Sequence, residues 1–234
     1  MISEVTFQTY LFLNNKQFEI HVINKITNKK IYSEKLLLKE DNPDLKFDKL
    51  NKFLEVNIFK IEKVLKDFIK DIYVILDSKE FYSVKLSIKK ENNGKLINSE
   101  TLIHPLIDLK NLCQSNFHDK KIIHFLIEKY KIDDKSYNSL PNNINCNIFS
   151  LDTEFICLPN YLIAQLEKVL SNYHILLSKI LCANYVKKFT EKQDSNLFTT
   201  AGRIISGQNT NEVILVNKGS KNKGFFENFF DFFS

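Results

Sequence analysis

The stretch FQTYLFLNNKQFEIHVINKITNKKIYSEKLLL, residues 7–38, decides the fold class of the first part of the chain. Residues 7–13, 18–26 and 31–38 are rich in β-branched and aromatic side chains that partly alternate with polar ones, which is typical of strands. Residues 14–16 and 27–29 separate these segments and carry Asn, which tolerates the left-handed backbone of tight turns. The stretch therefore predicts three consecutive strands joined by hairpins.

A helix is expected after these strands, from Asn57 as its N-cap to about Lys70. Apolar residues recur there at helical spacing, with charged residues opposite: Ile58, Ile61, Val64, Leu65, Phe68 and Ile69. Residues 73–76 and 81–88 predict two further strands, and Asn92-Asn93-Gly94 predicts a hairpin turn.

The order of elements changes in the second half. We expect a helix from residue 99, with Pro105 in its first turn, then two long strands over residues 121–132 and 144–158. A helix over 159–172, a strand over 175–186, a short helix over 197–206 and a short strand over 212–216 follow. This order of elements predicts the α+β class, with small mixed sheets and helices packed on them.

Length and composition limit the possible classes. The 234 residues are enough for one or two domains, and 44% hydrophobic residues indicate a globular chain. The net charge of +5 is mild and spread out, so nucleic acid is not an expected partner. The start of the chain shows no secretory signal, and no apolar run reaches the roughly 20 residues of a membrane span, so a cytosolic protein is expected.

Motifs for catalysis or cofactors are lacking. Cys113, Cys146, Cys157 and Cys182 have no C-x-x-C spacing, so we expect buried thiols and no metal site. Gly202 and Gly207 have the glycine spacing of a phosphate loop without its lysine. We therefore expect neither an enzyme nor a bound cofactor.

Titratable residues in apolar or turn segments have simpler explanations than catalysis. His124 lies in the run IIHFLI, where a hydrogen-bonded strand histidine is expected. Asp152 and Glu154 share one face of a strand, and Asp133-Asp134 marks a turn; both pairs are expected to be solvated.

The end of the chain has the strongest physical pattern. On a helical wheel all its phenylalanines fall between about −20° and 140°, and the polar residues fill the opposite side. A polar linker, residues 217–224, carries lysines just before it. The apolar and basic residues of this segment are Phe225, Phe226, Phe229, Phe230, Phe232, Phe233, Lys218, Lys221 and Lys223.

Two interpretations of this amphipathic segment compete. A C-terminal helix can dock on the core of its own domain. It can also lie in a membrane surface, which the lysine-bearing linker favours. Ordering ten residues costs on the order of 10 kcal/mol, so one copy binds lipid weakly and self-association strengthens the binding.

The segment IIHFLIEKYKIDDKSYN, residues 122–138, together with this tail resembles the bacterial cell-division protein FtsA, an actin-like protein that tethers the FtsZ ring to the inner membrane. His124, Glu128, Tyr130 and Asp133 fall near the places of the FtsA pattern, and Pro141 matches its following proline. The resemblance implies a 1A-like part in residues 1–98, a 1C or SHS2-like domain in residues 99–189, and a return to the core in residues 190–216. Residues 217–224 are then a linker and residues 225–234 a membrane-targeting helix.

This sequence departs from the family at the nucleotide site. The turn Leu13-Asn14-Asn15-Lys16 lacks the glycine and the acid of the first phosphate loop, and the 2A and 2B subdomains have no room in the chain. ATP binding is therefore not expected. The loss of 2B, which holds the FtsZ tail in the family, puts direct FtsZ binding in doubt.

The resemblance implies a non-catalytic scaffold, peripheral to the inner face of the cell membrane at the division site. Its 1C-like part would contact other division proteins or copies of itself, and its tail would contact lipid. One alternative is an actin-like/SHS2 assembly protein of a type IV pilus or secretion system. Others are a small α+β enzyme without a recognisable motif and an interaction module whose tail docks in a partner's groove.

Overall fold

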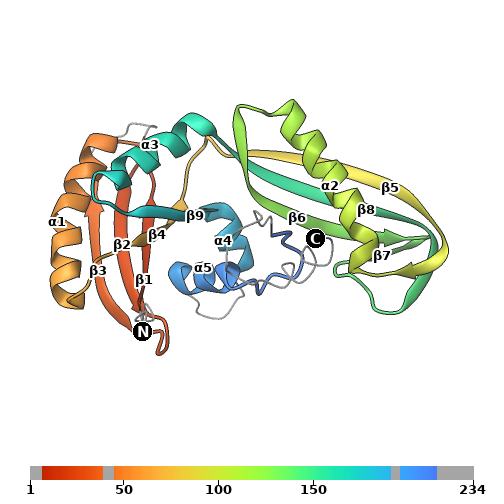
Figure 1. The fold of residues 1–234 in the computed structure, drawn as a ribbon, viewed down its shortest axis with the longest axis horizontal. Coiled ribbons are helices and arrows are strands. Elements are labelled where there is room, and N and C mark those ends of the chain that lie inside the picture. Colours follow the sequence, from red (N-terminus) through yellow and green to blue (C-terminus); the bar gives the residue numbers. More distant parts are fainter. Residues whose placement is uncertain (1–6, 39–44, 191–195, 215–234) are drawn as a thin grey trace. The chain divides into compact units, whose positions relative to one another are not determined.

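The computed structural model describes residues 7–38, 45–190 and 196–214, and its elements form two compact units (Figure 1). Unit 1 comprises residues 1–80 and 160–202, and unit 2 comprises residues 81–159 and 203–234. Each unit has its own sheet with helices packed on it. The predicted α+β class is confirmed.

Unit 1 is built on a five-stranded mixed sheet with the order β3-β2-β1-β4-β9. The first three strands are antiparallel, whereas β4 is parallel to both β1 and β9. Its strands are β1 (Phe7–Leu13), β2 (Gln17–Asn24), β3 (Lys30–Leu37), β4 (Asp71–Leu76) and β9 (Leu176–Cys182). The central strands β1 and β4 are mostly buried, as expected for strands covered on both faces.

Asparagine side chains close the two hairpins of this sheet. Asn14 Oδ1 accepts hydrogen bonds from the N–H groups of Lys16 and Gln17, at 2.9 and 2.7 Å. Asn24 Oδ1 does the same for Ile26 and Thr27, both at 2.9 Å. Both predicted turns are thus confirmed, and each is an Asx-type turn, in which a side chain satisfies the backbone donors.

The helices of unit 1 are α1 (Phe47–Leu65), α3 (Asn160–Ser171) and α4 (Ala183–Phe189), and α5 (Leu197–Ile205) crosses the boundary between the units. The prediction that Asn57 caps the first helix is wrong, because α1 begins ten residues earlier. Asn57 is buried inside the helix, where its Nδ2 donates to Phe53 O at 2.7 Å and its Oδ1 accepts from Tyr32 Oη at 2.6 Å. A cap residue and a buried, bridging Asn look alike in sequence.

The expected strand over residues 175–186 is also shorter than predicted. β9 ends at Cys182 and α4 begins at Ala183. An apolar run of this length fits a buried strand and a buried helix equally well, so periodicity does not place the boundary.

Unit 2 has a four-stranded antiparallel sheet with the order β5-β8-β6-β7 and the helix α2 (Ser99–Asn116) on one face. Its strands are β5 (Tyr82–Ile97), β6 (Lys120–Ile132), β7 (Lys135–Tyr137) and β8 (Ile144–Pro159). The core between helix and sheet contains Leu102, Leu106, Phe125, Tyr130 and Phe155. Pro105 lies inside α2, beyond the first turn where it was expected.

The predicted hairpin at Asn92-Asn93-Gly94 is not a hairpin. β5 continues through it as a bulge, with positive φ at Asn93 (52°) and Gly94 (73°), and still pairs with β8 on both sides. Asn92 Nδ2 donates to Lys95 O at 2.6 Å and closes the bulge. An Asn-Gly pair supplies left-handed backbone, which a bulge uses as well as a turn does.

The division of the chain by contacts differs from the predicted boundaries at 98/99 and 189/190. β5 pairs with β8 along 13 residue pairs, which places it in unit 2. β9 pairs with β4, which places residues 160–189 in unit 1. Of the expected strand over 212–216, the described part forms one bridge, between Leu126 and Glu212. The linker and the tail, residues 217–234, lie outside the described residues.

The substitution Asn57→Ala tests the buried bridge between α1 and β3. It removes two hydrogen bonds and leaves the hydroxyl of Tyr32 and the carbonyl of Phe53 without this partner. We expect the free energy of unfolding to fall by about 1–3 kcal/mol in a urea titration. Lys63→Ala, an exposed change on the same helix, is the control and should stay within about 0.5 kcal/mol of the wild type. Equal stability of Asn57→Ala and the wild type would contradict the bridging role.

Candidate functional site

The five residues of the FtsA-like pattern lie on one hairpin region of unit 2. His124, Glu128 and Tyr130 are on β6, Asp133 is in the turn between β6 and β7, and Pro141 lies between β7 and β8. Four of them have different roles: Tyr130 packs in the core, Glu128 pairs with Lys85, and His124 and Asp133 hold other segments. The structure thus distributes these side chains over separate contacts.

Asp133 connects the β6–β7 turn to β8. Its φ is 48°, and its Oδ1 accepts hydrogen bonds from the N–H groups of Asn147 and Ile148, at 3.1 and 3.0 Å. Asp133 N donates in turn to Ile148 O at 2.9 Å. The predicted turn at Asp133-Asp134 is confirmed, and its acid is a structural acceptor.

A buried pair fastens the last described residues to β6. His124 Nδ1 lies 2.8 Å from Glu212 Oε1, and both side chains are almost fully buried, at 0% and 6% exposed. The backbone adds two hydrogen bonds, from Ile127 N to Asn211 O (2.9 Å) and from Val213 N to Phe125 O (2.8 Å). The prediction of a hydrogen-bonded strand histidine is confirmed. Its partner Glu212 has no local signal, because 88 residues separate the two.

Polar side chains pair across three strands of the same sheet. Ser83 Oγ donates to Glu154, and Ser87 Oγ donates to Asp152 at 2.7 Å. Lys131 forms an ion pair with Asp152 at 2.7 Å, and the ammonium group of Lys131, followed by the Ser87 hydroxyl, lowers the pKa of Asp152. Because a lowered pKa keeps Asp152 ionised, it does not suit a general acid. Asp152 and Glu154 were expected to be solvated, whereas the structure shows them half-buried and bound to neighbouring side chains.

The cysteines behave as buried apolar residues, as predicted. All four are free and buried, and Cys113 Sγ and Cys157 Sγ lie 4.0 Å apart in the core of unit 2. Burial raises the pKa of Cys157 to about 12, so its thiol stays protonated at neutral pH. In the described part of the chain no three His, Cys, Asp or Glu residues form a group able to hold a metal ion.

Unit 2 also holds a mainly apolar pocket of about 340 Å³ beside α2. Leu102, Leu106, Ile127, Tyr130 and Leu140 supply its apolar wall. Asn211 lies at the pocket, where its Nδ2 donates to Asn138 O at 2.6 Å.

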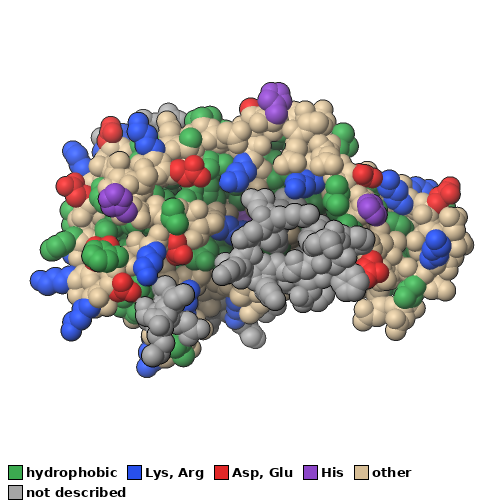
Figure 2. Space-filling view, in the orientation of Figure 1, with side chains coloured by type: hydrophobic (Ala, Val, Ile, Leu, Met, Phe, Trp, Pro, Cys, Tyr) green, Lys and Arg blue, Asp and Glu red, His purple; other side chains and the backbone are tan. Residues whose placement is uncertain are grey.

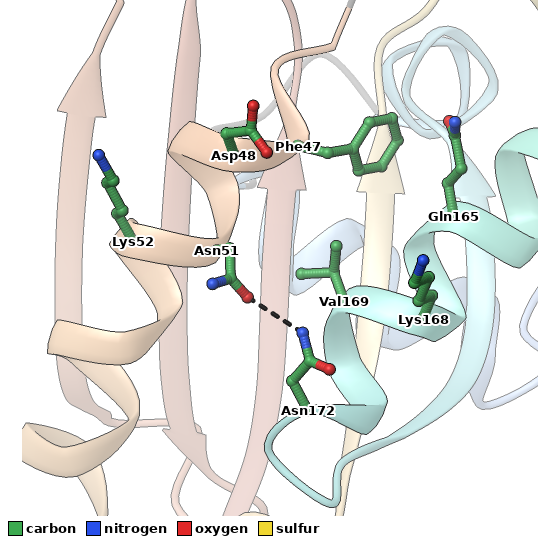
Figure 3. A pocket seen from close by; sticks show the side chains of 8 residues that line it. All are labelled: Phe47, Asp48, Asn51, Lys52, Gln165, Lys168, Val169 and Asn172. Atoms are coloured by element: carbon green, nitrogen blue, oxygen red, sulfur yellow. Dashed lines mark hydrogen bonds between the residues drawn. The ribbon is translucent and has the colours of Figure 1, made fainter.

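Unit 1 has a more polar groove of about 610 Å³ between the start of α1 and α3 (Figure 3). Asn172 Nδ2 donates to Asn51 Oδ1 at 3.3 Å across it, and Tyr173 Oη donates to Asn51 O at 2.8 Å. Lys52 from α1 and Lys168 from α3 both line the groove, together with the carboxamides of Asn51, Gln165 and Asn172 (Figure 3).

The turn after β1 corresponds to the first phosphate loop in the FtsA resemblance. Its N–H groups at Lys16 and Gln17 already donate to Asn14 Oδ1, and Asn14 N donates to Gln17 O at 3.0 Å. A phosphate-binding loop needs free N–H groups that point to the ligand. This turn uses those groups to hold its own shape.

Comparisons with known proteins find similar solved structures and no match by sequence. No known family profile matches the chain, and no curated protein matches it. Among solved structures, the cytoplasmic domain of EpsL, an inner membrane component of the type II secretion system of Vibrio cholerae, is similar with a TM-score of 0.39, 11% identity and coverage of 80% of this chain and 60% of that one.

Two further solved structures are similar. A PilM–PilN type IV pilus biogenesis complex has a TM-score of 0.49 at 6% identity, over 76% of this chain and 48% of that one. A Bacteroides thetaiotaomicron protein with an actin-like ATPase fold has a TM-score of 0.32 at 15% identity, over 81% and 58%. The chain thus spans between 48% and 60% of the length of these three proteins.

The truncated actin-like layout predicted from the sequence agrees with the topology of unit 1. Three antiparallel strands, a helix and a parallel strand come first, and the next parallel strand follows only after unit 2. In the described ranges, no helix combines the length and the apolar character that crossing a bilayer requires.

Glu212→Ala tests the attachment of the last described residues to β6. The change removes the buried hydrogen bond to His124, which is worth about 1.5–3 kcal/mol for a charged group. We expect the amide hydrogens of Ile127 and Val213, which bond across this contact, to exchange at least about tenfold faster.

Amides of the β5–β8 pairing serve as the internal control and should exchange as in the wild type. The exposed variant Glu100→Ala is the matched control for loss of an acid in unit 2. Unchanged exchange at Ile127 and Val213 in Glu212→Ala would show that the pair does not hold the segment.

Proposed function

We propose that this chain is a non-catalytic actin-like assembly protein that works as a scaffold at the inner face of the cell membrane. The observation that carries the proposal is the insertion of unit 2 between β4 and α3 of unit 1. An inserted unit with its own core can contact partners without disturbing the sheet that carries it. Its polar sheet face and its small apolar pocket are surfaces for protein contacts.

The proposal includes the absence of catalysis and of ATP binding. The hydrogen bonds of Asn14 within the turn after β1 support it, because they engage the N–H groups that a phosphate would need. The low pKa of Asp152 and the protonated Cys157 thiol support it as well, since neither group is poised for acid–base or nucleophilic work.

Membrane contact is assigned in this proposal to residues 225–234, with Lys218, Lys221 and Lys223 attracted to anionic headgroups. Glu227 and Asp231 oppose that attraction, so one tail binds reversibly. Self-association or binding to a membrane-associated partner protein then raises the overall affinity by multivalency.

Two finer assignments belong to the proposal. One is an FtsA-like role in cell division, based on the pattern from His124 to Asp133. The other is an assembly role in a type IV pilus or secretion system. Two of the similar structures carry names from that second class, and none of the three names cell division. Co-purification of the full chain with either division proteins or pilus and secretion proteins separates the two.

Thermal unfolding in the presence of Mg-ATP tests the non-catalytic part of the proposal. A ligand that binds only the native state stabilises it according to its concentration relative to its Kd. With 1 mM Mg-ATP we expect a Tm within about 1 °C of the ligand-free protein. Sodium triphosphate at equal ionic strength is the control. A Tm increase of several degrees that is specific to Mg-ATP would contradict the proposal.

Co-sedimentation of the full chain with vesicles that contain phosphatidylglycerol tests the tail. The double change Phe226→Glu and Phe230→Glu puts two charges on the apolar side, so we expect at least a tenfold weaker binding, about 1.4 kcal/mol or more. The control, Glu227→Gln with Asp231→Asn, changes only the polar side and should bind as strongly as the wild type or more strongly. Undiminished binding of the double Phe variant would remove the tail from the proposal.

A further inference from the structure

The outer side of α1 exposes apolar side chains at a place where a solvated helix normally presents polar ones. Phe59 is 72% exposed and Val56 is 53% exposed, one helical turn apart. The opposite side of the helix is buried on the sheet of unit 1 through Leu50, Phe53, Leu54, Asn57, Ile58 and Ile61. The exposed pair is therefore not part of the core of unit 1.

Lysines surround this pair. With Val56 at zero on a helical wheel, Phe59, Lys52, Lys63 and Lys60 fall between about −60° and 40°. All four are exposed, and within the described residues none of the three lysines forms an ion pair. We call Lys52, Val56, Phe59, Lys60 and Lys63 the α1 strip.

Acidic residues border the α1 strip on one side only. Asp48, Glu55 and Glu62 fall between about −80° and −120° on the same wheel. Glu62 Oε1 accepts a hydrogen bond from Ile69 N at 3.2 Å, which keeps that carboxylate at the end of the helix. Figure 2 shows blue, red and green side chains mixed over the end of unit 1 that α1 occupies in Figure 1.

The helix α1 holds the strip in a fixed shape. Lys52, at one end of the strip, also lines the groove between α1 and α3 (Figure 3). A rigid 19-residue helix, anchored by six buried residues, presents the strip without an ordering cost on binding. A preformed helical surface with interspersed Lys and aromatic side chains fits an anionic bilayer, where lysines meet phosphates and the ring enters the headgroup layer.

We propose that the α1 strip is a second membrane-contact surface, which lies on anionic lipid headgroups. The inference rests on the proposed function, and it adds a contact from unit 1 to the contact assigned to residues 225–234. Two weak contacts on one chain multiply in affinity when both engage one surface. The strip supplies charge attraction from three lysines and partial immersion of one aromatic ring.

Vesicle binding of the full chain tests this inference with charge reversal. We expect the triple variant Lys52→Glu, Lys60→Glu and Lys63→Glu to bind phosphatidylglycerol vesicles at least about tenfold more weakly than the wild type. Phe59→Ser should weaken binding about three- to tenfold and leave its salt dependence unchanged. The control, Lys89→Glu, Lys95→Glu and Lys121→Glu, makes the same change of net charge in unit 2 and should bind within about twofold of the wild type.

A fluorescent label gives a direct readout of the contact. The four native cysteines are buried, so a polarity-sensitive dye attaches selectively to Val56→Cys, with Lys89→Cys as the comparison site. The emission of the dye at Val56→Cys should shift to the blue on addition of vesicles, and that of the comparison site should not. Circular dichroism and Tm of every variant confirm that unit 1 is folded.

Each outcome separates this inference from the proposed tail contact. If the double Phe variant of the tail loses binding while the α1 triple variant binds like the wild type, the inference is wrong and the tail contact stands. If the dye on the tail-mutated chain still shifts, the inference stands whatever affinity that chain has lost, and only an undiminished affinity of the tail-mutated chain would remove the tail contact. A dimer in solution that dissociates in Phe59→Ser would assign the α1 strip to a second copy of the chain and overturn the lipid contact. A wild-type chain that does not bind the vesicles would overturn the lipid contact as well.

Discussion

The parallel pairing of β4 with β9 is the interaction on which the described structure depends. It joins Asp71–Leu76 to Leu176–Cys182, two stretches that all of unit 2 separates in the chain. β4 is the buried neighbour of β1, and without β9 its other edge would expose a row of backbone N–H and C=O groups. Unit 1 is therefore complete only when the chain returns from unit 2.

Bringing the chain back from unit 2 to unit 1 costs little conformational entropy, because unit 2 begins and ends on neighbouring strands. β5 follows β4 and β8 precedes α3, and the two are antiparallel, with Tyr82 opposite Cys157. The entry and the exit of the insertion therefore lie close together, and the folded unit acts as a short loop between β4 and α3. Next to the junction, Tyr161 Oη donates to Glu80 Oε2 at 2.9 Å. The inserted unit can therefore vary while the sheet that carries it stays intact.

The two units differ in the side chains that they expose. In unit 2, one sheet face carries Asp152, which pairs with Ser87 and Lys131, and Glu154, which accepts a hydrogen bond from Ser83. In unit 1, Val56 and Phe59 are among the exposed apolar side chains and lie beside lysines of α1. Within the described residues, no three His, Cys, Asp or Glu side chains form a group able to hold a metal ion.

Local patterns in the sequence were sufficient for most elements. Alternation placed β1, β2, β3, β6 and β8, and the helical spacing of apolar residues placed α3, each within a few residues. In these elements the apolar side chains face the core and the polar ones face away, so the spacing of apolar residues in the sequence reveals the type of element. His124 was placed as a bonded strand residue for the same reason, since a polar ring in an apolar run requires a partner.

The sequence by itself thus determined the α+β class, the presence of turns after β1 and after β2, and the type of most elements. Beyond the two hairpins of β1, β2 and β3, only the tertiary structure decided which strands pair, because a strand's pattern records which face is buried and not which neighbour covers its edge. The structure assigns β5 to unit 2 and β9 to unit 1, the reverse of the boundaries predicted from the sequence. It also pairs His124 with Glu212, which is 88 residues away in the chain. It also placed Asn57 inside α1, since the hydroxyl of Tyr32 that satisfies this buried amide arrives from another strand. Contacts between distant segments leave no local period, so they become visible only when the chain is folded.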